Sequence, residues 1–290
     1  MCFTLQSGEV DDLSSFTVIL VRIVSVIMSV IFIPLSGLTY GLDAFTLGKR
    51  NDEVIANVVG IGAYFRSQGI ACDGEHFYFS SKTTLIKTED DAKTFINADF
   101  SAIPDELKEL GIKHIGGMSY YNGKIYAGME DSKVWDYPIV GVFDADTLQL
   151  ENYFIMDDEV ITRGMPWVTV DPETGCLWCA DHSKKPTKLL CYDTANDMSF
   201  VSEVPLSESV PSIQGAEFFE GFMYAATNDD SQAIYKIDTA TGSVEKFLDR
   251  NLTGGEGEGM TFITRDGVTK LVAMDMGVIF VDAFIREYDM

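Results

Sequence analysis

Basic residues are scarce in this chain. Lys and Arg number 21 against 45 Asp and Glu among 290 residues, which gives a formal net charge of −24 with neutral histidine. Because a nucleic-acid-binding protein needs a basic surface, this balance argues against a nucleic-acid partner. An acidic chain is instead compatible with bound cations and with good solubility.

Motifs for a tightly held cofactor are also missing. Histidine occurs only at His76, His114 and His182, and no His/Cys cluster has the spacing of a zinc site. The chain contains neither a GxSxG nucleophile elbow nor a P-loop. The run of residues 254–259 is rich in glycine, but it is acidic and lacks the lysine of a phosphate-binding loop. No nucleotide or organic cofactor is therefore indicated.

Cysteine is sparse and odd in number, which argues against a disulfide framework. The five residues are Cys2, Cys72, Cys176, Cys179 and Cys191. Cys176 and Cys179 have CxxC spacing, but they fall in a predicted strand, where residues three apart point to opposite faces. This argues against a redox or zinc role. Cys179 and Cys191 face each other across a predicted hairpin, and an oxidising compartment would allow a disulfide between them.

Only one long hydrophobic run is present. Residues 16–35 carry a single charge, at Arg22, and these 20 residues are about enough for a membrane helix. With Arg22 as the basic start, residues 23–35 as the apolar centre and small residues behind it, the run also has the layout of a signal peptide. A buried core helix is a third alternative. The basic pair at residues 49–50 would favour keeping the C-terminal side of the run in the cytoplasm, which argues against a secretory signal.

Of these alternatives we favour export. Residues 1–49 are then a leader that is either cleaved or kept as a membrane anchor, and residues 50–290 form the folded domain. The protein would be secreted or membrane-anchored, with membrane contact only through the leader.

The rest of the chain is repetitive. Five segments share an apolar strand, a glycine-containing turn and a second apolar strand, and their aligned positions are Gly69, Gly117, Pro166, Gly215 and Gly259. Each repeat fits about four short strands in roughly 45–50 residues, which is typical of a β-propeller blade. We predict an all-β propeller with five four-stranded blades, six blades being the alternative. Residues 53–60 are a candidate for the missing outer strand of the last blade, and one short helix is expected between Pro104 and Gly111.

This architecture predicts where side chains converge. In a meander blade, the start of the innermost strand and the end of the second strand lie on the same face, around the central channel. The innermost-strand candidates, for ligand binding or proton transfer, are Gln68, His114, Arg163, Trp167, Gln214, Glu256 and Glu258. The second-strand candidates are Glu130, Asp181, His182, Asn228, Asp229 and Asp275.

The acidic strand ends suggest a cation site. Carboxylate and amide oxygens suit calcium, so we predict that calcium binds near the axis. The proposed ligands are Glu130, Asp181, Asn228, Asp229 and Asp275. The alternative is ordinary turn chemistry, because Asp and Asn commonly end strands.

Two segments resemble a known family. Residues 67–81 resemble the TQGL strand that opens plant-type glutaminyl cyclotransferases and their bacterial counterparts, and residues 214–221 with 237–242 resemble their NELEY segment and the turn that follows it. The resemblance implies an exported five-bladed propeller that cyclises N-terminal glutamine. Glu217 matches the second acid of NELEY, whereas Gln214 and Gly215 depart from its first two residues. Residues 256–261 look like that family's EGWGLT, but they lie in the last repeat rather than the middle one.

A looser resemblance is to calcium-dependent lactonase and esterase propellers, which use Glu, Asn and Asp around an axial metal. Two classes of function therefore stay open. The first is an enzyme acting on a small molecule or a peptide terminus, either cyclotransferase-like or lactonase-like, with Glu217, Glu256 and Glu258 as catalytic candidates. The second is a non-catalytic binding propeller that uses the same face, with Gln68, His114, Arg163, Trp167, Gln214 and His182 as ligand-binding candidates in either case.

Overall fold

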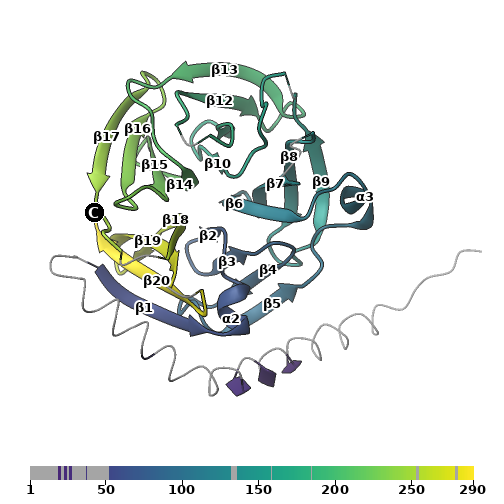
Figure 1. The fold of residues 1–290 in the computed structure, drawn as a ribbon, viewed down its shortest axis with the longest axis vertical. Coiled ribbons are helices and arrows are strands. Elements are labelled where there is room, and N and C mark those ends of the chain that lie inside the picture. The colour runs from purple at the N-terminus through teal and green to yellow at the C-terminus, as the bar shows by residue number, and fades with distance from the viewer. Residues whose placement is uncertain are drawn as a thin grey trace, which may run out of the picture.

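The computed structural model describes most of the chain beyond residue 51. The described ranges are 52–131, 136–157, 159–183, 185–252, 255–277 and 280–290, together with Ile19, Leu20, Ile23, Val24, Val26, Ile27 and Gly37. In this part, five four-stranded antiparallel sheets stand around one axis (Figure 1). The prediction of an all-β propeller with five blades is confirmed, and the six-blade alternative is wrong.

Each blade is a meander that runs from the axis outward. Blade 1 contains β2 (Ile70–Cys72), β3 (Phe77–Ser80), β4 (Leu85–Thr88) and β5 (Phe95–Asp99). Blade 2 contains β6 (His114–Tyr121), β7 (Lys124–Glu130), β8 (Ile139–Asp144) and β9 (Leu150–Ile155). Blade 3 contains β10 (Val168–Val170), β11 (Cys176–Cys179), β12 (Lys188–Asp193) and β13 (Ser199–Pro205).

The last two blades follow the same plan. Blade 4 contains β14 (Ile213–Phe219), β15 (Phe222–Thr227), β16 (Ile234–Asp238) and β17 (Ser243–Leu248). Blade 5 contains β18 (Glu256–Arg265), β19 (Val268–Met276), β20 (Asp282–Asp289) and, as its outer strand, β1 (Asp52–Val59). Two short helices are α2 (Ile61–Tyr64) and α3 (Asp105–Glu109). Helix α3 lies between Pro104 and Gly111, as predicted.

Two-residue turns join the inner strands of three blades. The central residues are Asn122 and Gly123, Glu220 and Gly221, and Asp266 and Gly267, and all six have positive φ angles. Positive φ at both central residues is the requirement of a type I′ turn, whose twist matches the flanking strands. The turn signals in the sequence therefore set the hairpin registers.

The core is divided among the blade interfaces. Each pair of neighbouring blades encloses its own cluster of buried apolar side chains, because both faces of every blade are covered. Each cluster has members from both blades, for example, from the blade 1–2 interface round to the blade 5–1 interface, Leu85 and Ile125, Val140 and Leu190, Leu189 and Met223, Ile234 and Leu271, and Phe79 and Val272.

The ring is closed by the first strand of the domain. β1 pairs antiparallel with β20, so a strand from the beginning of the propeller completes the blade that holds the end of the chain. Inside this blade the buried guanidinium of Arg286 lies 2.9 Å from Asp52 on β1 and 2.6 Å from Asp275 on β19. The predicted outer-strand role of residues 53–60 is confirmed.

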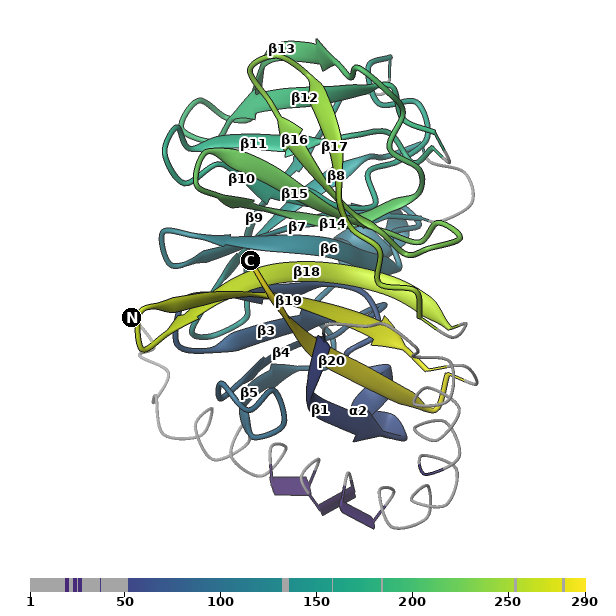
Figure 2. The same cartoon turned by 90° about the vertical axis from the view of Figure 1, so that its left-hand side faces the viewer.

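Glycines bring the innermost strands together at the axis. A Cβ atom on Gly215 would lie 2.8 Å from the Cα of Gly259, and one on Gly259 would lie 3.2 Å from the Cα of Gly69. A Cβ on Gly69 would lie 3.1 Å from the Cα of Gly117, and one on Gly117 would lie 2.7 Å from the Cβ of Trp167. These four glycines and Trp167, which we call the glycine ring, close the channel by backbone contact. Figure 2 shows the inner strands running along the axis.

The cysteines do not form the disulfide that the sequence allowed between Cys179 and Cys191. Cys72, Cys176, Cys179 and Cys191 are all free thiols. The register pairs Cys191 with Trp178 and Cys179 with Leu190, so the two thiols point to opposite faces of blade 3. Cys179 packs toward blade 2 and Cys191 toward blade 4, which rules out a bridge between them. Cys176 and Cys179 lie on strand β11, as predicted.

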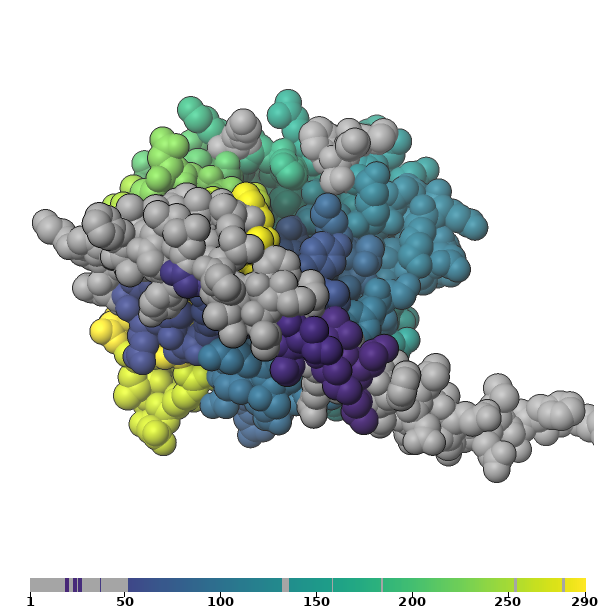
Figure 3. All heavy atoms as spheres, turned by 60° about the horizontal axis from the view of Figure 1, so that its bottom comes forward, coloured from purple at the N-terminus to yellow at the C-terminus, as the bar shows by residue number. Residues whose placement is uncertain are grey.

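The described residues of the leader are helical and lie on the surface (Figure 3). Leu20 and Val24 line a hollow of about 370 Å³ against Ile61, Tyr64 and Phe100. None of the seven described leader residues belongs to a blade strand, and the other residues of the apolar run lie outside the described part of the chain. Within that described part, the structure contains no helix that is both long and apolar enough to cross a membrane.

The close packing of the glycine ring predicts that one added methyl group lowers the stability of the protein. We expect Gly117→Ala to lower the free energy of unfolding by about 1–3 kcal/mol, because the added carbon would lie 2.5 Å from the carbonyl oxygen of Gln214. Urea denaturation measures this change. Gly37→Ala is the control, since its added Cβ meets nothing within 4 Å. Equal stability of Gly117→Ala and wild type would show that the ring is not tightly packed.

The closing ion pairs predict a second effect on stability. We expect Arg286→Met to cost about 3–5 kcal/mol, because it leaves the buried carboxylates of Asp52 and Asp275 without their cation. Arg265→Met is the matched control, because Arg265 on β18 of the same blade is 35% exposed and pairs with Glu287 on β20 and with the exposed Asp90 of blade 1. That change should cost no more than about 1 kcal/mol. Equal losses in the two variants would contradict this account of closure.

Candidate functional site

The candidate residues gather at one end of the blades. The register pairs His114 with Glu130 and Glu256 with Met276, so the beginnings of the innermost strands meet the ends of the second strands. In blade 4, the backbone nitrogen of Asn228 likewise donates to the carbonyl of Ser212. We call this end the entry face. Its innermost-strand residues include Gln68, His114, Trp167, Gln214 and Glu256.

One buried carboxylate connects three blades on the entry face. Oε1 of Glu130 lies 3.6 Å from Nδ1 of His114 and 3.5 Å from Nδ1 of His182. On its other side, Nε2 of His114 lies 2.5 Å from Oε1 of Gln68. The exposed fraction is 3% for the Glu130 side chain, 18% for His114 and 48% for His182. The cluster therefore extends from a buried acid to a histidine in contact with solvent.

The two histidines have opposite electrostatic environments. Burial lowers the pKa of His114, and the nearby charge of Glu130 only partly offsets this. A hydrogen bond to Glu130 raises the pKa of His182, against a smaller effect of burial. Of the two, His182 is thus the one that holds a proton more readily near neutral pH.

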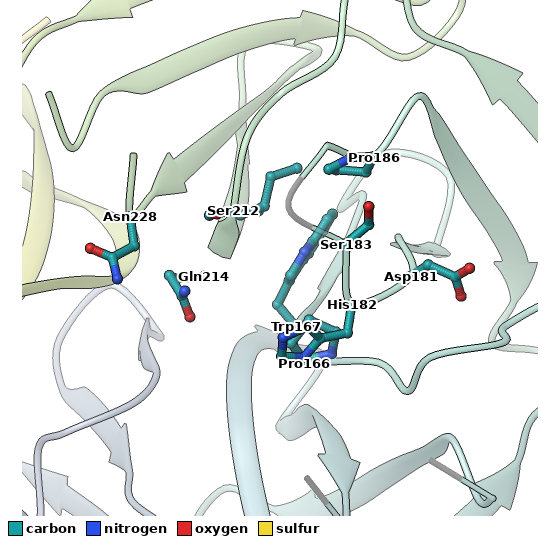
Figure 4. A pocket seen from close by; sticks show the side chains of 10 residues that line it. Pro166, Trp167, Asp181, His182, Ser183, Pro186, Ser212, Gln214 and Asn228 are labelled. Carbon is teal, nitrogen blue, oxygen red and sulfur yellow. The ribbon is translucent and has the colours of Figure 1, made fainter. Parts of the chain in front are cut away.

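A hollow of about 200 Å³ opens beside His182. Its lining includes Trp167, Asp181, Ser183, Gln214 and Asn228. Figure 4 shows Gln214 and Asn228 on one side of this hollow and His182 with Trp167 on the other. The lining mixes apolar residues such as Trp167 and Ile213 with several polar side chains, and polar groups that converge on a hollow can orient a small molecule.

Blade 5 adds two carboxyl groups to the entry face. Nδ2 of Asn228 donates to Glu256 at 3.2 Å, and Oδ1 of Asn228 accepts from the backbone nitrogen of Gly257 at 3.2 Å. Glu258 is 2% exposed and immediately precedes Gly259 of the glycine ring. Burial, and then the charge of Glu256, raise the pKa of Glu258 well above its ordinary value, while Arg250 opposes them.

Glu217 lies on the other side of the glycine ring. It is two residues beyond Gly215, or about 6–7 Å further along the strand. Its carboxylate accepts hydrogen bonds from the hydroxyl of Ser119 at 3.2 Å and from that of Thr169 at 3.4 Å. Because blades 2 and 4 are not neighbours, the Ser119 contact crosses the axis. Burial raises the pKa of Glu217 to about 8. The ring therefore separates this acid from the entry face.

Other predicted ligands have structural partners. Asp229 accepts hydrogen bonds from the backbone of Ser231 and Ala233 and from the hydroxyl of Tyr235. Asp181 accepts hydrogen bonds from the backbone nitrogen and hydroxyl of Thr162, although it also lines the hollow. These two residues fit the alternative of turn chemistry.

Two further predicted site residues, Asp275 and Arg163, lie outside the hollow beside His182. Asp275 is paired with Arg286 inside blade 5, and Arg163 is exposed. Within the described ranges, no group of three or more His, Cys, Asp or Glu side chains is arranged to hold a metal ion. Calcium binding stays a prediction.

The partners of Glu217 were not anticipated from the sequence. Ser119 and Thr169 each stand two residues after a glycine-ring member, Gly117 or Trp167, which is the spacing of Glu217 from Gly215. Aligning the repeats by this position would have placed all three at one level of the axis. Ser183 and Pro186, which line the hollow, lie in a loop that carries no repeat signal.

Comparison with known proteins supports the fold. No family model matches the chain, and no curated protein matches it either. Among solved structures, the glutaminyl cyclase of Myxococcus xanthus is 16% identical with a TM-score of 0.56, covering 81% of this chain and 95% of that one. A luciferin-regenerating enzyme is 13% identical with a TM-score of 0.45, covering 81% of this chain and 96% of that one. The chain is thus a five-bladed propeller similar in fold to the Myxococcus enzyme.

Glu217 predicts a specific dependence of stability on pH. Its pKa is about 8 in the folded protein against an ordinary value of 4.5, so the folded state holds this proton more tightly than the unfolded state. The resulting stability is fully present below pH 4.5 and is lost as pH rises through about 8. We expect the free-energy difference between wild type and Glu217→Gln to fall over this interval. Denaturation at several pH values measures it.

The control for this pH series is Glu245→Gln, which changes an exposed carboxylate on β17. The difference between wild type and this variant should stay nearly constant. A difference between wild type and Glu217→Gln that is equally flat from pH 5 to pH 8 would show that Glu217 is not a desolvated acid.

Proposed function

We propose that the entry face binds a small polar molecule or a peptide terminus, and that Glu258 transfers a proton in an acyl-transfer reaction on it. The observation that carries this proposal is the position of Glu258. Of the five residues that directly precede the glycine-ring positions, namely Gln68, Gly116, Pro166, Gln214 and Glu258, only Glu258 is an acid.

The environment of Glu258 suits this role. A carboxyl group whose pKa is raised by burial retains its proton and can give it to a leaving group. The side-chain amides of Gln68 and Gln214 occupy the equivalent positions in the two neighbouring blades, and amides both donate and accept hydrogen bonds. Glu256, held by Asn228, is a second carboxylate on the same face.

Cyclotransferase-like chemistry is the first form of this reaction to test. Closing a lactam from an N-terminal glutamine requires a base for the attacking amine and an acid for the departing ammonia. The fold shared with the Myxococcus glutaminyl cyclase supports testing this substrate class first. Hydrolysis of a lactone or ester uses the same groups with water as the nucleophile. Export of the protein, which rests on the apolar run at residues 16–35 alone, belongs to the same proposal.

Binding without catalysis is the second candidate. It is favoured by the lining of the hollow beside His182, where the one carboxylate among the lining residues, Asp181, is already bonded to Thr162. A ligand held there by Trp167, Gln214 and Asn228 would have no reactive acid in contact with it.

The test is a substrate panel with the purified full chain. Peptides with N-terminal glutamine, lactones and aryl esters are incubated with the protein, with and without calcium and chelator, and products are identified by mass spectrometry. We expect turnover of one class, and a loss of about 10²–10⁴-fold in kcat for Glu258→Gln. Glu245→Gln, which removes an exposed carboxylate on β17, should keep full activity.

The outcomes separate the alternatives. Full activity of Glu258→Gln would remove Glu258 from the mechanism. Activity that requires calcium would favour the lactonase-like form. No turnover of any class by a folded protein would contradict the enzymatic proposal and leave the binding propeller.

A further inference from the structure

Two free cysteines of blade 3 lie on the same face of neighbouring strands. Cys176 is the first residue of β11, and Cys191 lies on β12, which runs beside it (Figure 2). The register pairs Cys176 with Asp193 and Trp178 with Cys191, so the two cysteines are diagonal neighbours across the strands. Both pack against the cluster of buried side chains between blades 3 and 4. Cys179 packs toward blade 2 and takes no part.

The two thiols are in contact. Burial, and then a hydrogen bond with Cys176, raise the pKa of the Cys191 thiol to about 12. A thiol is a weak donor and a weak acceptor, so such a bond forms only when the two sulfur atoms are close neighbours. Both thiols are free. The pair differs from both pairs that the sequence spacing singles out, namely Cys176 with Cys179 and Cys179 with Cys191.

The two sulfur atoms differ in their access to solvent. Cys176 is half-buried and follows a turn whose residues 172–174 are exposed, whereas Cys191 is 2% exposed. A dissolved reagent therefore reaches Cys176 first. Ser202, which pairs with Cys191 on β13, forms a hydrogen bond that partly opposes the larger effect of burial on the pKa of Cys191. An accessible thiol beside a buried partner is the arrangement of an attacking and a resolving cysteine.

We propose that Cys176 and Cys191 are an attacking and a resolving cysteine that form a reversible disulfide by exchange with a small-molecule disulfide such as oxidised glutathione. This site is separate from the proposed function. Cys176 begins β11, whereas the entry face lies beyond the other end of that strand, where Asp181 lines the hollow. The disulfide joins two strands of one blade, away from the entry face.

The exchange takes two steps. The thiolate of Cys176 attacks one sulfur of the small-molecule disulfide, whose S–S bond breaks, and one small thiolate leaves and takes up a proton. Cys191 then gives its proton to solvent, and its sulfur attacks the sulfur of Cys176 and displaces the second small thiol. Two protein thiols are oxidised to one disulfide, and one small disulfide is reduced to two thiols.

The position of the pair predicts that the bond is labile. Diagonal neighbours on a sheet lie farther apart than directly opposite residues, at about 7–8 Å. A disulfide across such a separation needs a small backbone shift, and the resulting strain makes the bond easier to reduce. Strained disulfides are typical of regulated bonds rather than structural ones. Excess reduced thiol should therefore reverse the bond in the folded protein.

The test maps the cysteines of the full chain by mass spectrometry and needs no substrate. The native protein is incubated with oxidised glutathione, the remaining thiols are alkylated, and a tryptic digest is analysed without reduction. Cleavage at Lys188 separates the two cysteines into different peptides. We expect these peptides to be joined by a disulfide that fragmentation locates at Cys176 and Cys191. Excess reduced glutathione, added before alkylation, should separate them.

Single variants identify the bond. Cys176→Ser should abolish the linked peptides, and Cys191→Ser should stop the exchange at a mixed disulfide of glutathione on Cys176. Cys72→Ser is the matched control, because Cys72 is a half-buried free thiol on β2 of blade 1, and its loss should leave the linked peptides unchanged. Far-UV circular dichroism checks that each variant is folded.

The outcomes decide the inference whether or not Cys191→Ser folds, because wild type and Cys176→Ser suffice. Alkylation of both thiols in wild type, or glutathione that stays on Cys176 without the second step, would overturn it. Linked peptides that persist in Cys176→Ser would overturn it as well. A bond that resists excess reduced glutathione would contradict its reversibility. None of these results bears on Glu258, because the test involves no substrate.

Discussion

The close approach of the innermost strands at the axis governs the rest of this molecule. Four glycines and Trp167 bring backbone against backbone, so the five blades meet without an open channel between them. This contact divides the polar groups of the axis into two sets. Gln68, Gln214 and Glu258 lie on the side of the entry face, whereas Glu217 lies beyond the ring with Ser119 and Thr169. A ligand bound at the entry face therefore meets the first set and not the second.

The same blade that closes the ring also carries the proposed acid. Arg286 joins Asp52 of the closing strand β1 to Asp275 of β19. Burial and then Glu256 raise the pKa of Glu258, and Asp275 adds a smaller effect in the same direction. Arg250, buried and bonded to three backbone carbonyls, opposes that effect. Because buried charges interact more strongly than exposed ones, closure of the ring and the protonation of Glu258 are linked through these few groups. The proposed proton donor therefore lies in the blade that is assembled from both ends of the domain.

Much of the fold could be predicted from the sequence, because a repeat and its turns are local signals. Asn122–Gly123 and Asp266–Gly267 specify type I′ turns by themselves, and the spacing of the repeats then gives the blades. Alignment of the repeats also placed His114, Glu130, His182 and Gln214 at one end.

The remaining features could not be predicted, because they depend on partners that are distant in sequence. Asp275 is predicted as a metal ligand because the sequence does not reveal its buried ion pair with Arg286. The resemblance makes Glu217 a catalytic candidate beside Glu256 and Glu258, because no local pattern reveals that glycines close the axis between them. A disulfide between Cys179 and Cys191 stays open from the sequence because only the strand register shows that the two thiols point to opposite faces.

The acidic residues of the chain include two kinds of carboxyl group, which differ in whether their pKa is lowered or raised. Asp144 ends a strand and accepts hydrogen bonds from the backbone and hydroxyl of Thr147, which hold its pKa at about 2. Such turn aspartates remain charged and contribute to solubility. Near the axis the pKa values shift in the opposite direction. Burial raises the pKa of Glu217 more than its hydrogen bonds lower it, and burial raises the pKa of Glu258 more than Arg250 lowers it. In a chain with a formal charge of −24, these axial acids favour the protonated form while the turns stay ionised. The entry face thus holds Glu258, a buried carboxyl group whose pKa is raised by burial and by Glu256, and Glu256 itself accepts a hydrogen bond from Asn228. The proposed site therefore depends on the burial of this carboxyl group rather than on the total number of acids.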